Sequence, residues 1–139
     1  MANNQDVFQY SMSSNSAWAG YKAHQNPNFF PKLASGQWPQ ILWLGCSDSR
    51  CPETTILGLQ PGDVFVHRNI ANIISPTDIN TSAVIEYAVM HLKVKHVVLP
   101  SRSSLTGCQG GGLPGGIQIS DAVQGGDMGT QDLFERHAV

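Results

Sequence analysis

The sequence predicts an α/β fold in which a parallel β-sheet core is flanked by helices and preceded by an N-terminal helical arm. Three short apolar runs, at residues 41–44, 64–67 and 96–99, have the length and composition of buried strands. The segments between these runs carry helical patterns and only short connections. Strands that alternate with helices in this way are typical of a parallel sheet.

The helical arm is predicted over residues 16–34. We expect residues 1–15, which are polar, to be disordered. Asn26 and Pro27 interrupt the helical pattern, so the arm should break there. Its apolar side chains are expected to anchor the arm on a core, either of the same chain or of a second subunit: Trp18, Tyr21, Phe29, Phe30 and Leu33.

The elements of the predicted sheet follow one another closely. Residues 41–44 are apolar throughout, as expected for a strand that is covered on both faces. Pro52 suits the first turn of a short helix. After the second strand, a longer helix with Val84 and Ala88 on its apolar face runs to about Leu92.

The composition changes after Leu99. Of the 14 glycines in the chain, the nine from Gly107 to Gly129 lie in this last part, and no strand or helix pattern returns before residue 132. We therefore expect three parts: a disordered N-terminus at 1–15, an α/β domain at 16–99, and an atypical glycine-rich segment at 100–139.

Composition excludes some classes of function. The chain has 139 residues, a formal net charge of −2 and only 13% charged residues, so it offers no electrostatic case for binding nucleic acid or an anionic membrane. No apolar run approaches the ~20 residues of a membrane-spanning helix, and the N-terminus lacks the pattern of a signal peptide. We expect a cytoplasmic protein. The low charge also predicts that a partner subunit covers part of its surface.

The candidate chemistry lies directly after the first predicted strand, in the run from Cys46 to Arg50. Sites in parallel sheets form at this carboxyl edge. A cysteine thiolate is a good zinc ligand. Arg50 is spaced to pair with Asp48 and keep it ionised, so Asp48 can accept a hydrogen bond from a metal-bound water or bind the metal itself. The alternative is a buried structural cysteine followed by a polar loop.

Four stretches of the chain resemble the β-class carbonic anhydrases, with a fungal character. They are QWPQILWLGCSDSR at 37–50, PETTILG at 52–58, PGDVFVHRNIAN at 61–72 and VIEYAV at 84–89. The similarity extends over residues 16–99. The resemblance implies a zinc enzyme, active as a homodimer or higher oligomer, in which a zinc-bound hydroxide converts carbon dioxide reversibly to bicarbonate.

The resemblance also implies roles for individual residues. Cys46 matches the first zinc ligand. Asp48 and Arg50 match a catalytic dyad, whose aspartate orients the zinc-bound hydroxide or occupies the fourth zinc position. The other matched residues are Gln37, which would hydrogen-bond substrate or bicarbonate, Phe65 and Tyr87, which would line the pocket partly across a dimer interface or simply pack in the core, and the structural pair Arg68 and Asn69.

The chain departs from the family after the third strand. The family completes its metal site there with Cys-Gly-His-x-x-Cys-Gly-Gly, whereas this chain has Arg102 and Leu105 at the two ligand positions. Cys108 is the nearby thiol and the candidate second cysteine ligand. It could instead be a free cysteine in a flexible loop. A change of reading frame or a retained intron after Leu99 would explain the different composition.

Three functions are compatible with a chain that resembles the family up to Leu99 and departs from it afterwards. The first is a zinc-dependent carbonic anhydrase with a rearranged second set of ligands. The second is a truncated, weakly active or inactive family member that acts through association with other subunits. The third is a related hydrolase that acts on another small heterocumulene.

Overall fold

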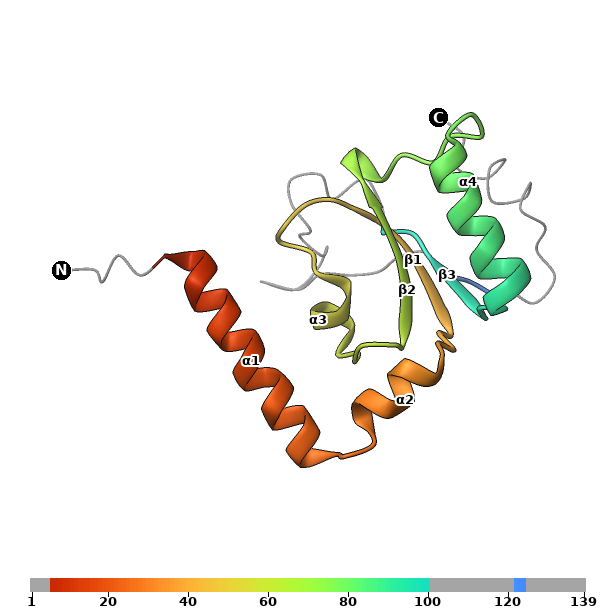
Figure 1. The fold of residues 1–139 in the computed structure, drawn as a ribbon. Helices are drawn as coiled ribbons and strands as arrows, with labels where there is room; N and C mark the ends of the chain where they lie inside the picture. Colours follow the sequence, from red (N-terminus) through yellow and green to blue (C-terminus); the bar gives the residue numbers. More distant parts are fainter. Residues whose placement is uncertain (1–5, 101–121, 125–139) are drawn as a thin grey trace. The chain divides into compact units, whose positions relative to one another are not determined.

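The computed structural model describes residues 6–100 and 122–124, which form helices and one β-sheet (Figure 1). The chain divides into two compact units, Met1–Gly36 and Gln37–Val139. The first unit contains the predicted arm, and the second contains the sheet and its helices. No helix among the described residues is both long enough and apolar enough to span a membrane.

The arm consists of α1, Val7–Gln25, and α2, Phe29–Ser35. The break between them falls at the predicted position. However, α1 begins at Val7, inside the segment for which the sequence predicted disorder. The side chain of Asp6 explains this start, because it accepts a hydrogen bond from the backbone N–H of Phe8 at 3.0 Å and so caps the helix.

Three of the predicted anchors of the arm pack on one another. The ring of Trp18 meets Phe29 and Phe30 edge to face, with centroids 6.2 and 6.0 Å apart. Such edge-to-face pairs are a favoured arrangement of aromatic rings. These ring contacts hold the first turn of α2 against α1 within this first unit.

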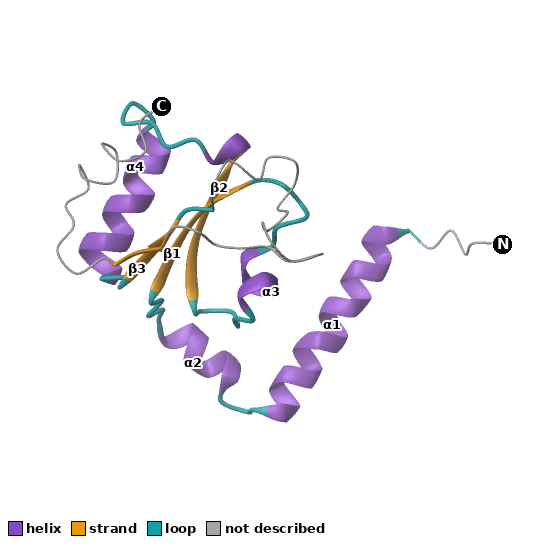
Figure 2. Ribbon diagram, turned by 180° about the vertical axis from the view of Figure 1, so that it is seen from behind, coloured by secondary structure: helices purple, strands orange, loops and turns teal. Residues whose placement is uncertain are grey.

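The predicted parallel sheet is confirmed, and it has one further strand. Its order is β2-β1-β3-β4, and β1 pairs in parallel with both β2 and β3 (Figure 2). The fourth strand pairs antiparallel with β3 and lies in the glycine-rich segment, where no strand was predicted. Three residues are too few to show an alternating pattern. The strands are β1 Ile41–Cys46, β2 Val64–Asn69, β3 His96–Val98 and β4 Ala122–Gln124.

Helices lie on opposite faces of this sheet, as Figures 1 and 2 show for α3 and α4. Successive side chains of β2 point to opposite faces. His67 contacts Thr81 in α4, with 3.1 Å between Nε2 and Oγ1, whereas Arg68 pairs with Glu53 in α3. The helices are α3 Glu53–Leu57, a 3-10 turn Ile70–Asn72, α4 Ile79–Glu86 and a π-helical continuation Tyr87–Leu92.

The core lies between α4 and the sheet. Leu42 and Leu44 of β1 pack there with Ile85 and Ala88, all 2% exposed or less. The central position of β1 explains why its apolar run is continuous, since both faces are covered. On the other face, a Cβ atom at Gly45 would overlap the indole Nε1 of the buried Trp43. Glycine is therefore required immediately before Cys46.

Candidate functional site

The candidate site is built on Cys46, the last residue of β1. Among the residues with a described position, Cys46 has a free thiol, and it is half-buried. In the parallel register, Cys46 is opposite Asn69, the last residue of β2. The thiol therefore lies at the carboxyl edge of the sheet, which is where the sequence predicted a site.

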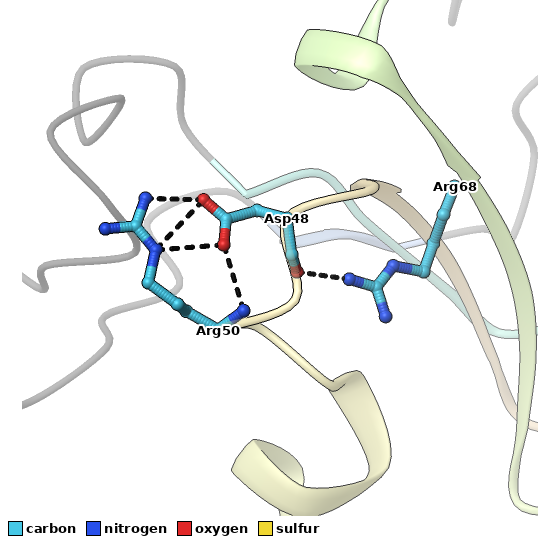
Figure 3. Close-up of polar contacts among 3 residues, drawn as sticks. All are labelled: Asp48, Arg50 and Arg68. Atoms are coloured by element: carbon cyan, nitrogen blue, oxygen red, sulfur yellow. Dashed lines mark hydrogen bonds and ion pairs between the residues drawn. The ribbon is translucent and has the colours of Figure 1, made fainter. Parts of the chain in front are cut away.

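Asp48 and Arg50 form a bidentate ion pair beyond the end of β1 (Figure 3). Nη2 of Arg50 donates to Oδ2 of Asp48 at 2.6 Å, and Nε donates to Oδ1 at 3.0 Å. The backbone N–H of Arg50 also donates to Oδ1, at 2.9 Å. A two-residue spacing thus lets one arginine supply both its guanidinium and its amide to the same carboxylate.

This pairing keeps Asp48 ionised. The hydrogen bond from the Arg50 guanidinium is the main cause, followed by that from the Arg50 amide, and together they lower the pKa of Asp48 from 3.8 to about 2. The side chain of Asp48 is 24% exposed, and that of Arg50 is 63% exposed. At neutral pH Asp48 is therefore an oriented anion that can accept a further hydrogen bond or coordinate a cation.

Arg68 holds the backbone of the same loop. From β2, its Nε donates to the carbonyl of Cys46 at 2.8 Å. Its Nη2 donates to the carbonyl of Asp48 at 2.5 Å (Figure 3). Its Nη1 pairs with Oε2 of Glu53 at 3.3 Å. The loop is further tied to β2 because the N–H of Ser47 donates to the carbonyl of Asn69 at 2.9 Å.

Through these contacts Arg68 and Asn69, the structural pair that the resemblance implied, hold the backbone of the loop that follows β1. Arg68 sets the position of the backbone that carries both Cys46 and Asp48. Sequence reasoning did not identify Glu53 as the partner of Arg68. The acidic residue in the first turn of α3 was a visible signal, but its partner lies 15 positions away in the chain.

The predicted pocket residues form a separate group within one chain. The rings of Phe65 and Tyr87 pack with centroids 5.9 Å apart and planes tilted by 34°. Phe65 is opposite Leu42 in the register, and Leu42 precedes Cys46 by four residues, or about 13 Å along a strand. Gln37 is exposed and precedes β1, near the opposite edge of the sheet from Cys46. The chain alone does not bring these three side chains to Cys46.

The donors at this edge fit part of a zinc site. Cys46 offers sulfur and Asp48 offers an ionised carboxylate, and zinc accepts both in proteins. Within residues 6–100 and 122–124, no group of three histidine, cysteine, aspartate or glutamate side chains could hold a metal ion. Cys108, the other predicted cysteine ligand, lies outside the described residues.

Comparison with known proteins gives consistent matches. A family model described as carbonic anhydrase matches residues 41–110. A carbonic anhydrase of Emericella nidulans is 49% identical over 106 residues, which are 76% of this chain and 46% of that protein. One of Candida albicans is 38% identical and shares 68% of this chain and 34% of its own length. The chain thus spans half or less of the length of these curated relatives.

Two solved fungal structures resemble the fold. A structure from work on two tetrameric β-carbonic anhydrases of Sordaria macrospora is 71% identical, with a TM-score of 0.67, over 81% of this chain and 59% of that one. A β-carbonic anhydrase of Aspergillus fumigatus is 52% identical, also with a TM-score of 0.67, over 79% of this chain and 54% of that one.

Proposed function

Because this chain belongs to the carbonic anhydrase family, as a fungal-type member of its β-class, we propose that it hydrates carbon dioxide reversibly to bicarbonate with zinc as its cofactor. The observation that carries this proposal is the pairing of a free thiol at Cys46 with an ionised carboxylate at Asp48, both at the carboxyl edge of the sheet. Carbon dioxide and bicarbonate are its proposed ligands.

The chain's own residues have distinct parts in this reaction. Zinc, when bound, lowers the pKa of a water ligand from 15.7 to about 7 and so supplies a nucleophile at neutral pH. Cys46 would hold the metal through its thiolate. Asp48 accepts a hydrogen bond and so orients an O–H group beside the Cys46 sulfur, and Arg50 keeps Asp48 ionised and fixed in direction. Arg68 maintains the spacing between the two donors through their backbone carbonyls.

We propose Cys108 as the second thiolate ligand. Of the three cysteines in the chain, Cys108 is the one that follows β3 in the sequence, where the resemblance implies that the other ligands lie. Two thiolates and the carboxylate of Asp48 would then be the donor set. In a resting form of this site Asp48 would occupy a metal position, and in the working form it would instead orient the O–H group; its ion pair with Arg50 keeps it ionised for either role.

Zinc content and the rate of carbon dioxide hydration, both measured on the purified full chain, test this function. We expect close to one zinc per chain and hydration well above the buffer rate. A chelator should remove both, and added zinc should restore both. Absence of zinc together with a background rate would contradict the proposal and favour an inactive member that acts through subunit association.

We further propose that the protein is a homodimer or a higher oligomer in which Phe65 and Tyr87 of one subunit line the site of another. Within one chain this aromatic pair lies far along the strand from Cys46. In the described sheet β2 is an edge strand, which is open to pairing with a second copy. Next to it, three apolar side chains of one helical segment are exposed: Ile79, Tyr87 and Met90.

Light scattering tests this assembly. Wild-type protein is expected to have at least twice the mass of one chain. Replacement of Tyr87 by glutamate should produce monomers and lower hydration, because a charge at a packed apolar contact is unfavourable. Ser47→Ala, an exposed change outside this surface, is the matched control. A monomer with full activity would contradict the shared site.

We also propose a cytoplasmic location. The half-buried thiol of Cys46 must stay reduced to bind zinc, and thiols persist in reducing compartments. Cell fractionation that recovers the protein from an oxidising compartment would contradict this location.

A further inference from the structure

Three side chains form a hydrogen-bond network between the start of α4 and β2. Oγ1 of Thr81 donates to Oδ2 of Asp78, the residue that caps α4. Nε2 of His67, in β2, lies 3.1 Å from the same hydroxyl oxygen. Thr81 is fully buried, so its hydroxyl makes both contacts away from water. We call Asp78, Thr81 and His67 the His67 network.

Charge fixes the direction of these bonds. The hydrogen bond from Thr81 is the main cause that lowers the pKa of Asp78, so Asp78 is ionised at neutral pH and can only accept. Thr81 has one hydroxyl proton, and it gives this proton to Asp78. Towards His67 the hydroxyl oxygen can therefore only accept, so Nε2 must carry a proton and donate it. The network thus requires the Nε2–H tautomer of the neutral imidazole.

A second neighbour of Nε2 does not change this assignment. Nδ2 of Asn69 lies 3.5 Å from Nε2 of His67, at the limit of a hydrogen bond, and it already donates to the carbonyl of Ile73 at 2.7 Å. An unprotonated Nε2 would place its lone pair against those of the Thr81 hydroxyl, only 3.1 Å away. The shorter contact therefore decides the tautomer.

The network joins the two elements of the proposed subunit surface. In the described sheet β2 supplies an edge, and the helical segment that begins with α4 supplies the exposed side chains of Ile79, Tyr87 and Met90. The same elements also meet where Phe65 packs on Tyr87. Apolar contacts are non-directional and tolerate small shifts. A buried hydrogen-bond network, in contrast, is satisfied in one arrangement only and so specifies how two elements are placed.

We propose that the His67 network positions α4 on β2 and thereby sets the shape of the surface that meets a second copy of this chain. His67 and Thr81 are positioning residues, because they act through the placement of Tyr87 and its exposed neighbours. This role rests on the proposed assembly, and it does not depend on the metal site.

Four variants isolate the network. Thr81→Val removes the hydroxyl and keeps the branched shape of the side chain. His67→Leu removes the donor and leaves the bond from Thr81 to Asp78 in place. His67→Gln is the conservative variant, because its amide can donate from nearly the position of Nε2. Ser82→Ala is the matched control, because it removes a neighbouring hydroxyl that donates to the carbonyl of Asp78 within the helix, at 2.8 Å.

Two measurements are made on each full-length protein. Sedimentation equilibrium over a dilution series gives the dissociation constant of the assembly. Nitrogen NMR of imidazole-labelled protein at pH 8 gives the tautomer of His67, whose signal is identified by its absence from His67→Gln. We expect the Nε2–H tautomer in wild type, and a dissociation constant raised about 10-fold in Thr81→Val and His67→Leu. His67→Gln and Ser82→Ala should assemble as wild type does.

Each contrary result has a distinct meaning. An Nδ1–H tautomer in wild type overturns the network. A wild-type dissociation constant in both Thr81→Val and His67→Leu overturns its role in assembly, and equal weakening by Ser82→Ala does the same, because the effect is then general to the helix. Wild-type protein that stays monomeric at every concentration overturns the proposed assembly and this role with it.

A folding defect is separated from an assembly defect by circular dichroism of the dissociated subunits. If Thr81→Val subunits have lost their helical signal, the comparison of His67→Leu with His67→Gln decides the question. Weaker assembly of His67→Leu alone supports the inference, and equal assembly of the two variants overturns it.

Discussion

Replacement of Cys46 by serine is expected to abolish tight zinc binding and to lower carbon dioxide hydration by more than about 1,000-fold. Serine keeps the size of the side chain, but its hydroxyl does not ionise near neutral pH and is a poor zinc ligand. Without zinc, the pKa of the nucleophilic water returns from about 7 to 15.7. Metal analysis and stopped-flow hydration assays on the purified variant measure both effects.

Two companion variants interpret that result. Ser49→Ala changes an exposed residue of the same loop and should keep wild-type zinc content and rate. Cys108→Ser should lose zinc if Cys108 is the second thiolate, and retention of zinc would remove Cys108 from the site. A Cys46→Ser protein that still holds one zinc per chain would contradict the assignment of Cys46 as a ligand.

Replacement of Arg68 by methionine is expected to lower the free energy of unfolding by about 2–3 kcal/mol and to weaken zinc binding. Methionine has a similar length but no donors, so the carbonyls of Cys46 and Asp48 and the carboxylate of Glu53 all lose their Arg68 hydrogen bonds. The side chains of Arg68 and Glu53 are only 26% and 14% exposed, so water replaces these bonds poorly. Chemical denaturation and chelator competition are the measurements.

Glu53→Gln is the matched control for Arg68. It removes the ion pair but leaves both bonds from Arg68 to the site loop, so we expect a loss of about 1 kcal/mol and near wild-type zinc affinity. Since the two residues share a contact, the effects of Arg68→Met and Glu53→Gln should not add in the double variant. If Arg68→Met binds zinc as tightly as wild type, Arg68 has no part in holding the site.

Much of this protein follows from local sequence. The three apolar runs correspond to β1, β2 and β3. The run of β1 is the clearest, because this central strand is covered on both faces. The pairing of Asp48 with Arg50 also follows, because a two-residue spacing places the guanidinium within reach of the carboxylate. Such features depend on residues close in the chain, and composition or spacing reveals them directly.

Two local predictions failed for physical reasons. The start of α1 at Val7 depends on a single cap at Asp6, and one polar residue in a polar segment gives little signal. The strand Ala122–Gln124 exists through its pairing with β3, and its own three residues carry no recognisable pattern. In both cases one specific contact outweighed the average tendency of the segment.

Only the tertiary structure decided how the site is held. Arg68 reaches carbonyls 20 and 22 positions earlier in the chain. The tertiary structure also places Phe65 and Cys46 far apart along the strands, although the resemblance to the family assigned both residues to the same pocket. These relations depend on strand order and register, which bring distant segments together at one edge of the sheet, and no local pattern in the sequence records them.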